Sequence, residues 1–122
     1  MRASDFLTES NNSDLIKSFL PVAQRELQIT RLPTIKLVDR VPDADGTTFG
    51  CYNKDADTIY VVIQGRHPKD ALRTLAHELV HYKQNIENRL DDHSGSTGSE
   101  EENEANARAG VIMRHYNEAN PE

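Results

Sequence analysis

Hydrophobic residues recur at helical spacing in three segments of this chain, at about residues 14–29, 69–90 and 100–117. Ser13 stands where the first helix needs an N-cap, and Pro21 inside that helix predicts a kink or a break. Each segment carries apolar side chains along one face, as a helix does when it packs on a core. The predicted core positions are Leu15, Ile16, Phe19, Leu20, Ala23, Leu27, Leu72, Leu75, Ala76, Leu79, Ile86, Leu90, Ala105, Ala109, Ile112 and Tyr116.

Strand-forming residues gather between the first two helical segments. We expect strands at about residues 34–39, 48–53 and 58–64, the last two joined as a hairpin by residues 54–57. The third strand is apolar on both faces, which is typical of an interior strand, whereas the second is shorter and more polar, which suits an edge. The order of helix, three strands and two helices predicts a compact α+β fold with a small mixed sheet packed on the second helix.

The length of 122 residues fits a single domain. We expect a flexible N-terminal arm over residues 1–12 and one domain over residues 13–120. Residues 91–99 consist of Asp, His, Ser, Gly and Thr, and this composition is typical of a mobile linker between the last two helices.

Charge and cysteine content exclude several classes of protein. The formal net charge is −6, which disfavours a nucleic-acid partner. The one cysteine, Cys51, rules out a framework of internal disulfides and suits a reducing compartment. The chain contains neither an apolar run of the ~20 residues that span a membrane nor a recognisable signal peptide. We therefore expect a soluble, cytoplasmic monomer with no membrane partner.

The predicted second helix carries the string His77-Glu78-Leu79-Val80-His81. Histidines four residues apart lie on one helix face, so both imidazoles can bind a single tetrahedral metal ion. Glu78 follows the first histidine and can act as general base toward a metal-activated water. The simpler alternative is a helix whose histidines are surface groups. The helix has a polar stripe on one face and leucines on the opposite face, and this favours the catalytic interpretation. The stripe consists of Thr74, His77, Glu78, His81 and Gln84 or Asn85.

Two histidines leave such a site one protein ligand short. The metzincin pattern requires a histidine at position 87, where this chain has Glu87, so that branch of metallopeptidases is excluded. His93 in the predicted linker is one candidate for the third ligand, because a loop can bring it back to the helix.

The acidic cluster that opens the last helix supplies the other candidates. Glu104 lies four residues before Arg108, where an exposed ion pair explains it. Glu100 lies in the first turn, where a carboxylate favours the helix dipole. Glu102 falls at the margin of the apolar stripe, next to the core, although a capping box also explains it. Glu102 is therefore the preferred ligand, with Glu101, Glu104 and His93 as alternatives.

The segment Glu102-Asn103-Glu104-Ala105-Asn106 resembles the Glu-x-x-(Ala/Ser)-(Asp/Asn) signature that gluzincins carry downstream of their His-Glu-x-x-His helix. The resemblance implies Glu102 as the third zinc ligand and Ala105 packed under the site. It places Asn106 where gluzincins have an Asp that supports a ligand histidine. An Asn accepts the same hydrogen bond without bringing a charge.

The short interval from His81 to Glu102 and the order of elements are similar to those of the minigluzincins. Residues 77–84 and the opening residues 1–7 look like small phage-encoded His-Glu-x-x-His proteins, which would place the chain in the host cytoplasm. The resemblance implies a compact zincin-like domain with Zn²⁺ as cofactor and a peptide or protein as substrate. Minigluzincins are latent enzymes, so residues 117–122 are expected to block the cleft.

Zincins bind an extended peptide antiparallel to an edge strand. Residues 49–53 are the expected substrate-binding strand here, called the rail below. Tyr60, His93 and Tyr116 are candidates for stabilising the oxyanion. Cys51 is expected to be a packing residue, with a thiolate that caps the zinc as the alternative.

The sequence therefore predicts a zinc-dependent endopeptidase in which Zn²⁺ is held by His77, His81 and Glu102, and Glu78 is the general base. The main rival is a protein-binding module without catalytic activity, whose fold is stabilised by the same zinc ion. A second rival is an α+β binding domain without metal, which would be indifferent to a chelator.

Overall fold

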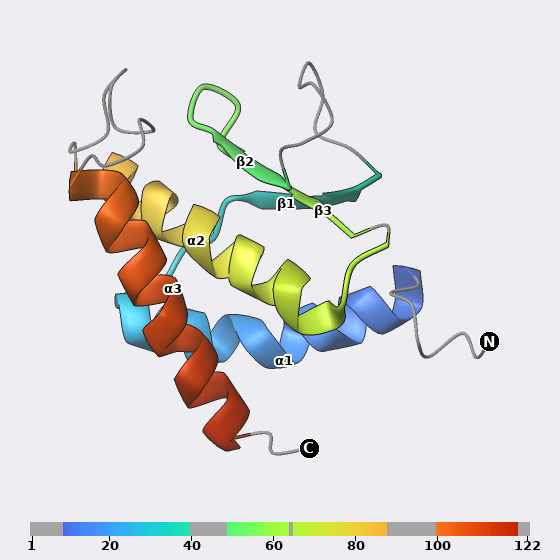
Figure 1. The fold of residues 1–122 in the computed structure, drawn as a ribbon. Helices are drawn as coiled ribbons and strands as arrows, with labels where there is room; N and C mark the ends of the chain where they lie inside the picture. Colours follow the sequence, from blue (N-terminus) through green and yellow to red (C-terminus); the bar gives the residue numbers. More distant parts are fainter. Residues whose placement is uncertain (1–8, 40–48, 64, 88–99, 120–122) are drawn as a thin grey trace.

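The computed structural model describes residues 9–39, 49–63, 65–87 and 100–119 (Figure 1). It shows an α+β fold of three helices and a small mixed sheet, as the sequence predicts. No described helix combines the length and apolar character needed to cross a membrane. The elements in chain order are α1 (Glu9–Leu27), β1 (Thr34–Val38), β2 (Gly50–Asn53), β3 (Thr58–Val62), α2 (Pro68–Ile86) and α3 (Glu100–Ala119).

The sheet has the strand order β1-β3-β2. The central strand β3 pairs parallel with β1, from Thr34 opposite Thr58 to Val38 opposite Val62, and antiparallel with β2. Four of the five β3 residues are buried, which confirms the prediction of an interior strand. β2 lies at an edge, also as predicted. The hairpin connection is held by Asn53, whose Oδ1 accepts backbone N–H bonds from the two residues at positions 55 and 56.

Helix α2 occupies the centre of the fold, with the sheet on one side and α1 and α3 on the other (Figure 1). His67 caps its first turn by accepting the backbone N–H of Lys69, and Pro68 takes the first helical position, which needs no N–H donor. The prediction that Ile86 belongs to the core is wrong, because this last residue of the helix is 53% exposed. Leu90 lies outside the described residues.

Helix α1 begins earlier than the sequence predicts. It starts at Glu9, so Ser13 is an interior helical residue and not the N-cap, and residues 9–12 of the predicted arm are helical. The Ser and Asn residues there are only weakly unfavourable in a helix, at about 0.5 kcal/mol each, which continuous packing of the following turns outweighs. The helix runs through Pro21 without a break and ends at Leu27, followed by Gln28 with a φ of 58°.

Helix α3 packs lengthwise against α2 and also contacts α1. Its buried face comprises Ala105, Ala109, Ile112 and Tyr116, as predicted, together with Met113. Ala105 and Ala109 are almost fully buried, and their small side chains allow neighbouring helices to approach closely. The predicted linker over residues 91–99 lies outside the described residues.

Strand β2 approaches α2 so closely that only glycine fits at position 50. A Cβ on Gly50 would lie 2.3 Å from Thr74 Cγ2 and 3.5 Å from Glu78 Cγ. We expect Gly50→Ala to lower the free energy of unfolding by about 1–3 kcal/mol, because the strand or the helix must shift. Adding Thr74→Ser removes Cγ2 and keeps the hydroxyl that donates to the Asp70 carbonyl, so it should recover part of this loss. Urea unfolding of both single variants and the double variant measures the coupling, and strictly additive effects would contradict the steric explanation.

Candidate metal centre

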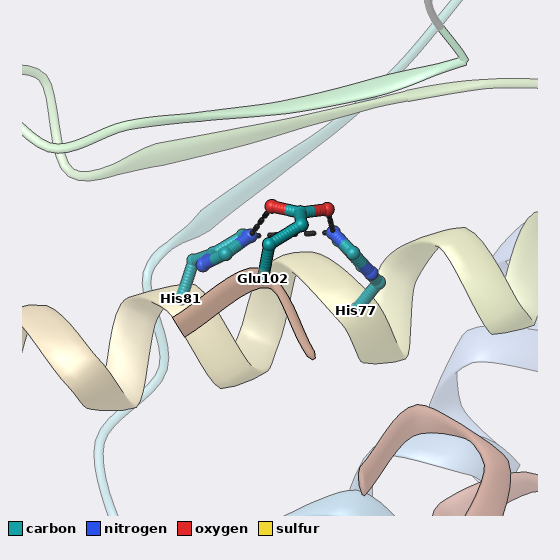
Figure 2. Close-up of side chains that lie close together, drawn as sticks. All are labelled: His77, His81 and Glu102. Atoms are coloured by element: carbon teal, nitrogen blue, oxygen red, sulfur yellow. Dashed lines mark hydrogen bonds and ion pairs between the residues drawn. The ribbon is translucent and has the colours of Figure 1, made fainter. Parts of the chain in front are cut away.

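Three potential metal-binding side chains converge between α2 and the start of α3. His77 and His81 are one turn apart on α2, and Glu102 comes from the first turn of α3 (Figure 2). The Glu102 carboxylate directs one oxygen to each ring, with Oε1 2.8 Å from His77 Nε2 and Oε2 3.1 Å from His81 Nε2. The two Nε2 atoms are 3.2 Å apart. The cluster is partly buried, so only its outer side faces solvent.

The spacing of these atoms is close to what one small metal ion requires. Ligands at about 2.0–2.1 Å around a tetrahedral zinc are about 3.3 Å from one another. The 2.8 Å and 3.1 Å contacts involve two different Glu102 oxygens; with one ligand atom taken per residue, the three atoms lie within 4.8 Å of one another, so the side chains must adjust to place one oxygen and both nitrogens around a single ion. Two imidazole nitrogens and one carboxylate oxygen also form a donor set typical of catalytic zinc sites, which keep the fourth position open. The residues present could therefore hold a metal ion.

The structure distinguishes among the candidates for the third ligand. Glu102 belongs to the donor cluster found in the described part of the chain, whereas Glu101 and Glu104 lie outside it. Glu104 forms the predicted ion pair with Arg108, at 3.9 Å, but it is half-buried and also accepts a 2.7 Å hydrogen bond from Gln84. Its predicted position on the solvent side is therefore wrong in part. His93 lies outside the described residues.

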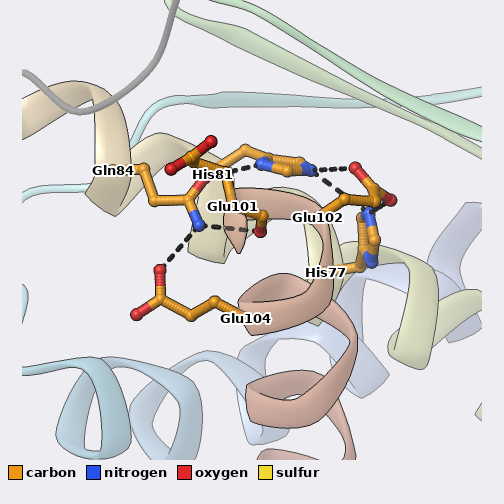
Figure 3. Close-up of polar contacts among 6 residues, drawn as sticks. All are labelled: His77, His81, Gln84, Glu101, Glu102 and Glu104. Carbon is orange, nitrogen blue, oxygen red and sulfur yellow. Dashed lines mark hydrogen bonds and ion pairs between the residues drawn. The ribbon is translucent and has the colours of Figure 1, made fainter. Parts of the chain in front are cut away.

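Each histidine of the cluster has its own hydrogen-bond partner. Gln84 Oε1 lies 2.8 Å from His81 Nδ1 (Figure 3). The side chain of Asn106 accepts a hydrogen bond from His77. The resemblance to gluzincins assigned this supporting position to Asn106, but sequence reasoning did not identify Gln84 as the partner of His81. The available signal was its position three residues after His81 on the same polar stripe.

Glu78 lies beside the cluster and is only 8% exposed. Burial, followed by repulsion from Glu102, raises the pKa of Glu78 to about 8, while a backbone hydrogen bond from Tyr52 opposes the rise. Burial is also the main cause that lowers the pKa of His77. A lowered imidazole pKa favours the neutral form, which is the form that binds metals. The site therefore combines an imidazole that favours its neutral form with a carboxyl group of raised pKa, as functional sites often do.

Among the described residues no strand pairs with the outer edge of β2, and this edge lies beside Glu78. The Phe49 carbonyl accepts a 2.9 Å hydrogen bond from the Val62 N–H, so residue 49 points its backbone groups toward β3. Because these groups alternate along an antiparallel strand, the N–H of Tyr52 must point away from β3. It donates to Glu78 instead. The predicted rail thus lies next to the predicted general base, with the ring of Phe49 53% exposed at its start.

The shifted pKa of Glu78 predicts how the stability of the metal-free protein depends on pH. The unfolded chain loses the Glu78 proton near the ordinary value of 4.5, whereas the folded protein keeps it until about pH 8. Between these values the native state binds more protons, so the Glu78 contribution to stability falls as pH rises. Glu78→Gln cannot titrate, and its stability relative to the native protein should increase by about 2–3 kcal/mol between pH 5 and 8.5.

Urea unfolding in the presence of a chelator measures this difference. His77 titrates in both proteins, so its opposite contribution cancels to a first approximation. The exposed Glu118→Gln variant on α3 makes the same chemical change away from the site and should follow the native protein at every pH. Parallel pH profiles of Glu78→Gln and the native protein would contradict the shifted pKa.

Several other residues singled out in the sequence lie outside the donor cluster. Cys51 is half-buried on β2, and burial followed by the charge of Glu78 raises the pKa of its thiol, which disfavours the zinc-capping thiolate. The Tyr116 hydroxyl lies 3.0 Å from Ser18 Oγ of α1, and its ring packs edge-on against Phe19. Tyr116 is therefore a core residue and not a group that stabilises an oxyanion at the site.

The helical part of the expected blocking segment does not cover the cluster. Residues 117–119 form the last turn of α3, about 22 Å from Glu102 along the helix axis at 1.5 Å per residue. Figure 1 shows this end of α3 far from the C-terminal half of α2. The rest of the predicted blocking segment, residues 120–122, lies outside the described residues.

Comparisons with protein-family models, with curated proteins and with solved structures give no match for this chain. The geometry of the cluster and the chemistry of its residues therefore carry the functional argument. The resemblance to gluzincins enters only as an interpretation of the residue pattern.

Proposed function

We propose that this protein is a zinc-dependent endopeptidase of the gluzincin type. The observation that carries the proposal is the convergence of His77, His81 and Glu102 beside the buried carboxyl group of Glu78. Glu102 follows His81 by 21 positions in sequence, so their meeting depends on the packing of two helices. A zinc ion with three protein ligands and one open position is the arrangement of catalytic sites.

In this proposal His77, His81 and Glu102 hold the zinc. When bound, zinc would supply Lewis-acid chemistry toward water and the scissile carbonyl. Glu78 takes a proton from the attacking water and later delivers it to the leaving amine. Asn106 and Gln84 keep the two imidazole rings oriented. The neighbouring Tyr52 N–H supports Glu78 from the strand side.

The substrate is an extended peptide that pairs with the outer edge of β2. Within this strand the backbone groups of residues 50 and 52 point away from β3; the Tyr52 N–H already donates to Glu78, and the remaining outward groups can pair with a peptide strand. The exposed ring of Phe49 lies under the Arg66 guanidinium, 4.4 Å from the ring centroid, and offers apolar contact at one end of the rail. Peptide class and cleavage preference follow from contacts along this edge.

The rival function is a zinc-stapled module that binds another protein. A domain of this size does gain stability from a metal ion. However, a structural site has no need for a buried carboxyl group beside the metal, and it closes its fourth position with a protein ligand. The burial of Glu78, together with its backbone contact to the edge strand, favours hydrolysis.

The test begins with elemental analysis of protein purified without added metal. One zinc per chain is expected, together with hydrolysis of an internally quenched peptide library that a chelator abolishes and zinc restores. Zinc without hydrolysis would support the stapled module. A protein that stays metal-free and equally stable after zinc addition would exclude both functions and leave the metal-free binding domain.

A further inference from the structure

We propose that Gln84 is a positioning residue that keeps the hydrogen of the His81 ring on Nδ1 and thereby reserves Nε2 for a metal. The consequence for metal binding rests on the proposed function, but the position of the hydrogen does not. Gln84 is on α2, three residues after His81, and is only 1% exposed. Figure 3 shows its amide between the His81 ring and the first turns of α3.

The orientation of the Gln84 amide is determined by its partners on α3. Its Nε2 lies 2.9 Å from the Glu101 backbone carbonyl oxygen and 2.7 Å from Glu104 Oε1. Both partners are acceptors, so the NH₂ group must face them. A flipped amide would set its oxygen against two other oxygens in a place that water does not reach, which is costly. The carbonyl oxygen Oε1 is therefore directed toward His81.

This orientation decides the state of the His81 ring. A carbonyl oxygen can only accept, and it lies 2.8 Å from His81 Nδ1, so Nδ1 must carry a hydrogen. The other nitrogen, Nε2, faces the cluster, 3.2 Å from His77 Nε2 and 3.1 Å from Glu102 Oε2, an acceptor that competes with Gln84 for the hydrogen of the His81 ring. When Nδ1 carries the hydrogen and donates it to a fixed acceptor, the ring presents the lone pair of Nε2 in a fixed orientation. A metal at Nε2 requires both.

The amide is anchored to the rest of the fold through charged side chains. Glu104, which receives one N–H of Gln84, pairs with Arg108 on the next turn of α3. Arg108 in turn donates to the backbone carbonyl of Glu26 near the end of α1, at 3.1 Å. His81 is thus held through a chain of contacts that spans three helices. His77 differs, because its partner Asn106 is exposed.

The hydrogen on His81 can be observed without any metal. Imidazole-selective ¹H–¹⁵N spectra of the metal-free protein at about pH 8.5, well above the ordinary histidine pKa, report which ring nitrogen is protonated. We expect a hydrogen directly bonded to Nδ1 that exchanges slowly with solvent. A His81 ring that carries its hydrogen on Nε2 alone would overturn the proposal, whether or not the protein binds zinc.

Variants then separate positioning from folding. Gln84→Met keeps the length of the side chain and removes the acceptor, so the slow exchange should be lost and zinc affinity should fall about 10- to 100-fold. The exchanged pair Gln84→Glu with Glu104→Gln restores an acceptor at Nδ1 with the same net charge, and it should keep the hydrogen and bind zinc within about threefold of the native protein.

Tyr82→Phe is the matched control for lost stability. Tyr82 lies on α2 two residues before Gln84. Its replacement by Phe removes the hydrogen bond from the Tyr82 hydroxyl to the Arg31 carbonyl and leaves the cluster untouched. Competition with a chromophoric chelator measures zinc affinity in all variants. The proposal would be overturned by native affinity in Gln84→Met, or by an equal loss in Tyr82→Phe. A native protein that binds no zinc would reject the peptidase proposal, while the spectra would still decide the role of Gln84.

Discussion

Glu78→Gln is expected to reduce zinc-dependent peptide hydrolysis by about 10²- to 10⁴-fold. The amide keeps the shape of the side chain but can neither take a proton from water nor deliver one to the leaving amine. Because Glu78 is not among the three clustered donors, the variant should still bind one zinc per chain. Initial rates on an internally quenched peptide, at zinc saturation, measure the loss.

The exposed Glu118→Gln variant is the matched control, because it makes the same chemical change on α3 away from the cluster. It should hydrolyse the peptide at the native rate. Full activity in Glu78→Gln would reject Glu78 as the general base. Loss of zinc in the same variant would indicate that Glu78 is a ligand, and the donor set would then require revision.

Glu102→Ala is expected to remove zinc from the protein. Without this carboxylate the site keeps only two imidazoles, which is one protein ligand fewer than catalytic zinc sites use. The loss should exceed the about 10- to 100-fold that follows from removing a hydrogen-bond partner of a ligand. Zinc per chain after purification and competition with a chelator measure it. Zinc should also raise the thermal midpoint of the native protein but not that of Glu102→Ala.

Two neighbouring variants decide whether the effect is specific. Glu101→Ala removes a side chain next to Glu102 whose backbone carbonyl, rather than its carboxylate, accepts from Gln84. His93→Ala removes another of the sequence-based candidates. Both should retain zinc. If either of them lost the metal while Glu102→Ala kept it, the third ligand would be that residue and not Glu102.

The sequence by itself determined the local features of this protein. Period-3.6 patterns predicted the described helices, and runs of strand-forming residues predicted the described strands. The central position of β3 followed from its apolar character on both faces. The spacing of His77 and His81 placed both imidazoles on one helix face. Element ends were less certain, and the start of α1 at Glu9 shows that packing outweighs weak local preferences.

The sequence favoured Glu102 among several candidates, but the tertiary structure decided that this carboxylate meets the histidines and that Gln84 contacts the His81 ring. Glu101, Glu102 and Glu104 have almost the same local sequence, and only the packing of α3 along α2 directs Glu102 between the rings. The same packing brings acceptors from α3 to the amide of Gln84. These contacts join residues about 20 positions apart. Their geometry depends on how two helix surfaces fit together, which the periodicity of either helix does not specify.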